Sequence, residues 1–296
     1  MTRTQHGKYG TFVASQAELD NPSRTHATYG KYAPWCYRYG YNWNSGQCWH
    51  CCEQYSNVAF LSLGDVNYVA ALGIERTGKT PYSYNMHFIC APVGATNDTW
   101  PGMNTNWKSN GKRSGIKMQD QGGFCIGPRN EIIASLKHGV NGGTEDEKSS
   151  HKGGLYAVYA ETGALAWEFE IDEDATTTPA VDKAGNVHFV TDDTGRYYIV
   201  KPDYDTKKAT VVSVADIYEL TLAAGYNLGE NNACRIWSSI AINDDGKMYF
   251  APTYRKNWDS YSGAVMCVSY EGCTGPGDTP WPMKGADARR SGVQKK

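Results

Sequence analysis

The sequence predicts an all-β protein built from four-stranded antiparallel units, and three observations lead to that prediction. Short runs of residues alternate between apolar and polar side chains, which is typical of strands. Polar turns that carry a glycine or an asparagine separate these runs. The same order of runs and turns recurs at intervals of roughly 40–60 residues. Long apolar stretches with helical spacing are scarce, and no run approaches the length of a membrane span.

The clearest unit is "GGLYAVYAETGALAWEFEI", residues 153–171. Its first run is apolar at both sets of alternate positions, so we expect this strand to be covered on both faces. In its second run Trp167 belongs to an apolar face and Glu168 to the opposite, polar face, so one face should be buried and the other solvated. Gly163 lies where a tight hairpin needs a positive φ. The stretch therefore predicts a hairpin whose first strand lies deeper than its second.

Related hairpins occur elsewhere in the second half of the chain. Three segments align without gaps, with Asn130, Gly185 or Gly246 at the turn: "CIGPRNEIIAS", "AVDKAGNVHFV" and "AINDDGKMYFA". A further strand follows each hairpin, which gives the order of a four-stranded blade. Isolated hairpins would leave strands with two apolar faces exposed, so the pattern favours a β-propeller whose blades cover one another. The length accommodates roughly seven blades, within a range of about six to eight.

The segment from about Cys125 to Gly272 resembles the quinoprotein dehydrogenase-type propeller repeat, also called the PQQ-like repeat. The resemblance rests on "LYAVYAETGALAW", with Trp167 in the outer strand, on "TTPAVDKAGNVHFV" and on "SSIAINDDGKMYFA". The closing "PWPMKGADARRSG" resembles a segment that such proteins carry beside the propeller. The other two blades lack the Thr-Gly followed by Trp. The resemblance implies divergent blades or a partial separate region over residues 1–123, propeller blades over 124–275 and a closing segment over 276–296.

Two insertions, residues 137–153 and 252–263, separate the second and third strands of their blades. In propeller topology, both emerge on the face that carries the links between blades. The second insertion is rich in aromatic and charged residues, a composition typical of a contact surface. Its candidate ligand-binding residues are Tyr254, Arg255, Asn257, Trp258, Asp259 and Tyr261. A short helix is expected on the same face within residues 214–237.

The stretch "QCWHCCEQ" holds Cys51 and Cys52 side by side next to His50. Adjacent cysteines cannot easily both reach one tetrahedral ion, so structural disulfides are favoured and no metal is expected. PQQ dehydrogenases carry a vicinal disulfide over their cofactor, and the resemblance therefore makes Cys51–Cys52 a candidate vicinal disulfide. Their tryptophan platform, calcium ligands and aspartate base are not identifiable here, so no cofactor is expected. PQQ with calcium is the alternative.

A period-two aromatic row, "APWCYRYGYNW" at residues 33–43, is typical of the core face of a strand or of a platform for sugar rings or a protein partner. The net charge of -2 gives no polycationic surface, so nucleic acid is not expected as a partner. The cysteine content and the resemblance indicate an extracytoplasmic location, in the periplasm or at the cell surface, with the leader missing from this chain.

The expected function is that of a non-catalytic binding or scaffold propeller of the bacterial envelope, which binds a glycan or an envelope protein on one face. The alternatives are a quinoprotein-type oxidoreductase, a carbohydrate-active propeller enzyme, or a structural domain of a longer surface protein. The fold by itself does not choose among them.

The cysteine pattern generates a direct test. We expect at least two disulfides among the nine cysteines, within residues 36–90, because short cross-linked loops would stabilise a region with poor strand patterning. Mass spectrometry after alkylation of the unreduced protein counts the free thiols. Nine alkylated cysteines would contradict both the disulfides and the expected export.

Overall fold

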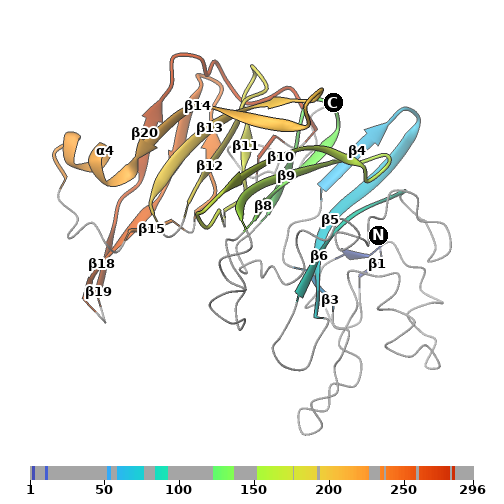
Figure 1. Cartoon of the computed structure of the whole chain (residues 1–296), viewed down its shortest axis with the longest axis horizontal. Helices are drawn as coiled ribbons and strands as arrows, with labels where there is room; N and C mark the ends of the chain where they lie inside the picture. Colours follow the sequence, from blue (N-terminus) through green and yellow to red (C-terminus); the bar gives the residue numbers. More distant parts are fainter. Residues whose placement is uncertain are drawn as a thin grey trace, which may run out of the picture. The chain divides into compact units, whose positions relative to one another are not determined.

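The computed structural model describes residues 2–3, 11–12, 52–54, 59–76, 84–92, 123–136, 152–175, 177–191, 194–226, 234–236, 238–257, 260–280 and 282–283. Over these residues the protein is mostly β, with one short helix (Figure 1). The chain divides into two compact units. The first contains Met1–Asp120, Gly139–His151 and Ala160–Ala164, and the second contains Gln121–His138, Lys152–Tyr159 and Leu165–Lys296.

The first unit contains a small antiparallel sheet centred on β5 (Val66–Arg76). Strands β3 (Cys52–Gln54) and β4 (Ala59–Leu63) pair with one edge of β5, and β6 (Tyr84–Pro92) pairs with the other. Two short strands, β1 (Thr2–Arg3) and β2 (Thr11–Phe12), form a separate antiparallel pair.

The second unit begins with four consecutive antiparallel strands, which we call quartet A. They are β7 (Phe124–Ile126), β8 (Glu131–Leu136), β9 (Gly153–Tyr159) and β10 (Leu165–Ile171). Asn130 turns between β7 and β8 with φ 59°, and Gly163 turns between β9 and β10 with φ 69°. Strand β9 is buried along almost its whole length, as two apolar faces predict.

Quartet B repeats this order. It contains β11 (Ala180–Val181), β12 (Val187–Val190), β13 (Arg196–Asp203) and β14 (Lys208–Asp216), all antiparallel. Gly185, with φ 79°, occupies the turn position that Asn130 holds in quartet A. Strand β14 pairs in parallel with β10 at Lys208 and Glu168, which joins the two quartets into one eight-stranded sheet.

A third group, sheet C, follows with β16 (Ala241–Ile242), β17 (Lys247–Phe250) and β20 (Met266–Ser269). Gly246 turns between its first two strands with φ 74°. The insertion between β17 and β20 forms a hairpin of β18 (Pro252–Asn257) and β19 (Ser260–Gly263), and β15 (Cys234–Ile236) pairs with β18. The short helix expected before sheet C is α4 (Ile217–Ala223), whose N-terminus is capped by the Asp216 carboxylate.

Alternate residues of quartet B face different neighbours, and this places the core. Phe189 and Tyr198 pack with residues of quartet A, and their rings stack with centroids 5.0 Å apart. The intervening residues Val190 and Tyr197 pack with sheet C, where Tyr197 lies 5.4 Å from the ring of Phe250. Because side chains alternate along a strand, one four-stranded layer separates two cores. This face-to-face packing is the arrangement expected of successive propeller blades.

Trp167 is completely buried in the core between quartets A and B, which confirms the prediction for this side chain. Glu168 was expected on a solvated face, and that prediction was wrong. Its side chain is 7% exposed and forms an ion pair with Lys208 of β14, with Nζ and Oε1 2.5 Å apart. Strand β14 covers this position, and the sequence around Glu168 does not reveal that neighbour.

The all-β prediction is confirmed at the level of a mostly β chain. Within the described residues, the second unit has two complete four-stranded groups, quartets A and B, and two three-stranded sheets, so the number of blades stays a prediction. The turn positions Asn130, Gly185 and Gly246 are equivalent in the three groups, as the alignment predicts, and all three have positive φ.

Trp167→Ala should lower the free energy of unfolding by about 3–5 kcal/mol, because it leaves a large cavity between the quartets. Urea-induced unfolding followed by circular dichroism measures the change. Val211→Ala, at a side chain of β14 that is 49% exposed, is the control and should stay within about 0.5 kcal/mol of the parent protein. A Trp167→Ala protein as stable as the control would contradict the interface assigned to Trp167.

Candidate functional site

Strands β11 and β12 are joined by a turn that holds the Asp182 carboxylate in a fixed position. Asn186 donates to it twice, from its backbone N–H to Oδ1 and from its side-chain amide to Oδ2, both at 2.8 Å. The Asp182 backbone N–H in turn donates to the Asn186 carbonyl at 2.9 Å. Asp182 is 1% exposed, so the turn places a carboxylate inside the protein.

His188, in the middle of β12, lies beside this carboxylate and is completely buried. Its Nε2 is 3.0 Å from Asp182 Oδ2, and its Nδ1 is 2.9 Å from the Tyr197 hydroxyl on the adjacent strand β13. The Tyr197 hydroxyl donates to Met248 Sδ at 2.9 Å. Both ring nitrogens of His188 therefore have polar partners, which fixes the orientation of the imidazole.

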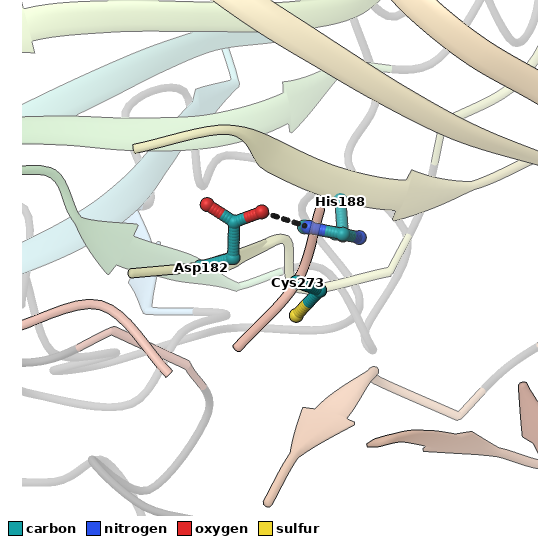
Figure 2. Close-up of side chains that lie close together, drawn as sticks. All are labelled: Asp182, His188 and Cys273. Atoms are coloured by element: carbon teal, nitrogen blue, oxygen red, sulfur yellow. Dashed lines mark hydrogen bonds and ion pairs between the residues drawn. The ribbon is translucent and has the colours of Figure 1, made fainter. Parts of the chain in front are cut away.

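Cys273 brings a third polar side chain to this place from the segment after β20 (Figure 2). The segment runs along β11: Lys183 N–H donates to the Gly275 carbonyl at 2.9 Å, and Gly277 N–H donates to the Val181 carbonyl at 2.8 Å. Gly246, in the first turn of sheet C, lies against the Cys273 carbonyl. The thiol of Cys273 donates to the Gly275 carbonyl over 3.9 Å.

We call Asp182, His188 and Cys273 the buried triad. Their ligand atoms all lie within 4.8 Å of one another, and each side chain is buried. Burial acts to raise the pKa of Asp182, but hydrogen bonds from His188 and Asn186 outweigh it, so the pKa is lowered and the carboxylate stays ionised. Burial raises the pKa of the Cys273 thiol, and the charge of Asp182 raises it further.

The buried triad is poorly suited to nucleophilic catalysis. A protonated thiol is a weak nucleophile, and its burial keeps a substrate away. A carboxylate, an imidazole and a thiol are, however, the three side-chain types that bind transition metals. Sequence reasoning missed this triad because its members are 6 and 85 residues apart and match no ligand-spacing motif.

The hairpin β18–β19 carries most of the candidate ligand-binding residues. The backbone places Arg255 opposite Tyr261 and Asn257 opposite Ser260. Trp258 and Asp259, at the hairpin tip, lie outside the described residues. The predicted insertion between the second and third strands is thus found, and it is a hairpin rather than an irregular loop.

Tyr254 was expected on the contact surface, and the structure corrects this expectation. The side chain is completely buried in the core around sheet C. Its hydroxyl lies 3.1 Å from the Thr221 hydroxyl of α4, and its ring lies 6.1 Å from that of Tyr218. Strand β18 begins inside the protein, so Tyr254 near its start packs in the core.

The predicted disulfides, including the vicinal pair of Cys51 and Cys52, stay predictions. Cys51 lies outside the described residues, and Cys52 is described by its backbone alone, in β3. Cys125, Cys267 and Cys273 are free thiols, and no disulfide occurs among the cysteine side chains that the structure describes. The aromatic row at residues 33–43 also lies outside the described part of the chain.

Three buried carboxylates between quartets A and B were not anticipated. Glu131 is completely buried, and its carboxylate accepts from the Tyr204 hydroxyl at 2.6 Å and from the Arg129 N–H at 2.8 Å. Glu173 accepts from the Tyr198 hydroxyl at 2.8 Å and from the Arg196 guanidinium at 2.6 Å. The third is Glu168, paired with Lys208. Each has partners from the other quartet or from its edges, so these groups fix how the quartets meet.

An open cleft lies beside the Glu131 network. It is lined by Arg129, Lys201, Pro202, Asp203, Tyr204, Asp205 and Thr210. The Arg129 guanidinium stacks on the Tyr204 ring, 3.9 Å from its centroid. The arginine and the tyrosine of this cleft therefore already contact each other.

No protein-family model matches the chain, and no curated protein matches it. Solved structures that resemble it include a protein of unknown function from Bacteroides caccae, with a TM-score of 0.34 and 14% identity over 74% of this chain and 61% of that chain. GH43 BlXynB from Bacillus licheniformis gives a TM-score of 0.35 and 13% identity over 73% of this chain and 39% of that chain.

Virginiamycin B lyase from Staphylococcus aureus gives a TM-score of 0.31 and 12% identity over 78% of this chain and 64% of that chain. This chain therefore spans less than two thirds of the length of each of these three proteins. At such low TM-scores the resemblances carry no argument about the activity of this chain. Over its described residues, the chain has no helix with the length and hydropathy needed to cross a membrane.

Gly246→Ala should destabilise the protein more than Gly185→Ala, although both glycines have positive φ at equivalent turn positions. A Cβ on Gly246 would lie 2.0 Å from the Cys273 carbonyl oxygen, whereas a Cβ on Gly185 would meet only Pro128 at 3.7 Å. The backbone strain common to both should cost about 1–2 kcal/mol, and displacement of the Cys273 segment about 1–3 kcal/mol more. Urea-induced unfolding compares the two variants. Equal losses of unfolding free energy in the two variants would contradict the close packing of the Cys273 segment against Gly246.

Proposed function

We propose that this chain is a non-catalytic β-propeller of the bacterial cell envelope, which uses the hairpin β18–β19 to bind a glycan or an envelope protein. The observation that supports the proposal is the hairpin itself. It is inserted between two core strands, β17 and β20, and extends away from the eight-stranded sheet (Figure 1). A projecting element on a well-packed scaffold is where binding residues usually occur.

The base of the hairpin is rigidly held, which favours a binding role over that of a simple connector. Tyr254 is anchored in the core and against α4, so the strand leaves the protein in a defined direction. Beyond this anchor the sequence offers Arg255, Trp258 and Tyr261, residue types enriched at the centres of interfaces. A flexible connector would instead favour glycine and serine.

The finer parts of the proposal are a propeller of roughly seven PQQ-like blades, no bound cofactor, and an extracytoplasmic location. The recurrence of the four-stranded order in quartets A and B, with equivalent turns at Asn130 and Gly185, supports the repeat. The number of blades rests on chain length and on the alignment of the repeats.

Replacing both Trp258 and Tyr261 with alanine should weaken ligand binding about 10-fold, or roughly 1.4 kcal/mol, and leave the melting temperature nearly unchanged. The ligand is first found by screening the protein against bacterial envelope glycans and purified envelope proteins. Titration calorimetry then compares the parent protein with the double variant.

Tyr226→Ala is the matched control, because this tyrosine is 63% exposed and belongs to the segment after α4 rather than to the hairpin. It should leave binding unchanged. A large loss of stability in the double variant would indicate that these aromatic side chains belong to the core, and unchanged affinity would remove the hairpin from the binding site. Dye reduction by protein reconstituted with PQQ and calcium would support the oxidoreductase alternative instead.

A further inference from the structure

The buried triad gathers three metal-binding side chains from separate parts of quartet B and the C-terminal segment. Asp182 follows β11, His188 lies in β12 and Cys273 follows β20 (Figure 2). The backbone around each residue is held by hydrogen bonds. Asp182 lies in the turn closed by Asn186, His188 lies in the β12–β13 ladder, and Cys273 precedes the segment that runs along β11. Donor atoms within 4.8 Å of one another need only a small adjustment to share one ion with metal–ligand distances of about 2.0–2.3 Å.

The hydrogen bonds around His188 direct its Nε2 toward Asp182, where a metal ion can replace a proton. The Tyr197 hydroxyl has a single proton, which it donates to Met248 Sδ. His188 Nδ1 must then donate its own proton to the Tyr197 oxygen. His188 Nε2 then faces Asp182 Oδ2, 3.0 Å away. A proton on Nε2 makes this contact a hydrogen bond, and a metal ion can take the place of that proton.

The charges at this place also suit a divalent cation. In the described part of the chain, the ion-pair partner of Asp182 is His188, and no lysine or arginine pairs with this carboxylate. A zinc ion that binds here displaces the proton of the Cys273 thiol to solvent, and the resulting thiolate together with the Asp182 carboxylate balances its charge of +2. A buried centre with no net charge avoids the high cost of an uncompensated buried charge.

We propose that Asp182, His188 and Cys273 form a binding site for a zinc ion that fastens the C-terminal segment to quartet B. Thiolate and imidazole donors select zinc over calcium and magnesium, which bind through oxygen. The hydrogen bond from His188 Nδ1 to Tyr197 is the outer contact that orients a metal-bound histidine. Since the three side chains are buried, the ion's role is structural. This site is independent of the ligand-binding hairpin.

The test counts the zinc bound per chain. Protein is stripped with a chelator, incubated with zinc, desalted and analysed by elemental mass spectrometry. Cys273→Ser and His188→Gln should each bind one zinc fewer than the parent protein. Cys125→Ser is the matched control, because Cys125 is also a buried free thiol but lies in β7, and this variant should lose none. Zinc at any other cysteines is common to all the proteins and cancels in the difference.

A second measurement needs no variant. Peptide-level mass spectrometry follows the alkylation of Cys273 in the parent protein in mild urea, with and without zinc. Zinc should slow the alkylation of Cys273 at least about 10-fold, because it binds and stabilises the folded state, and the thiolate it holds is no longer free to react. Equal zinc content in the parent protein and in Cys273→Ser, or an alkylation rate unaffected by zinc, would overturn the proposal and leave the triad as a hydrogen-bonded cluster.

Discussion

The packing of alternate residues of quartet B in opposite directions is the constraint on which the rest of the second unit depends. In β13, Tyr198 faces quartet A and Tyr197 faces sheet C. Neither core could form without the four-stranded layer between them, because each uses one face of that layer. A strand shifted by one residue would exchange the two faces and move the His188–Tyr197 pair out of its place beside Asp182.

Polar groups make the packing between quartets A and B specific. Glu131 and Glu173 are buried where apolar side chains would suffice to fill space, and both are held by hydroxyl and N–H donors. Buried carboxylates tolerate few alternative arrangements, because a lost partner leaves an unsatisfied charge. The position of Glu131 also restricts residue 127 to glycine, since a Cβ there would lie 2.3 Å from Glu131 Oε1. Apolar faces drive the quartets together, and the carboxylates select how they meet.

The C-terminal segment and the hairpin show two uses of the same scaffold. Cys273 and Met283 are buried against it, and the Pro282 carbonyl accepts from the Val181 N–H at 2.8 Å, so the segment behaves as part of the core. The hairpin is anchored at its base, where Tyr254 is buried and β15 pairs with β18. The C-terminal segment is thus suited to hold the fold together, whereas the hairpin is an insertion with a fixed base.

The sequence by itself determined the local features, because they depend on neighbouring residues: strand alternation, the turns at Asn130, Gly185 and Gly246, the helix within 214–237, and the apolar strand face that carries Trp167. It could not determine which strands face one another. The burial of Glu168 depends on Lys208, and the burial of Tyr254 depends on α4, so both were misplaced by patterns that consider one strand at a time. The buried triad depends most on tertiary structure. Asp182 and Cys273 meet only because the chain returns along β11 after sheet C, and no periodicity in the sequence encodes that return.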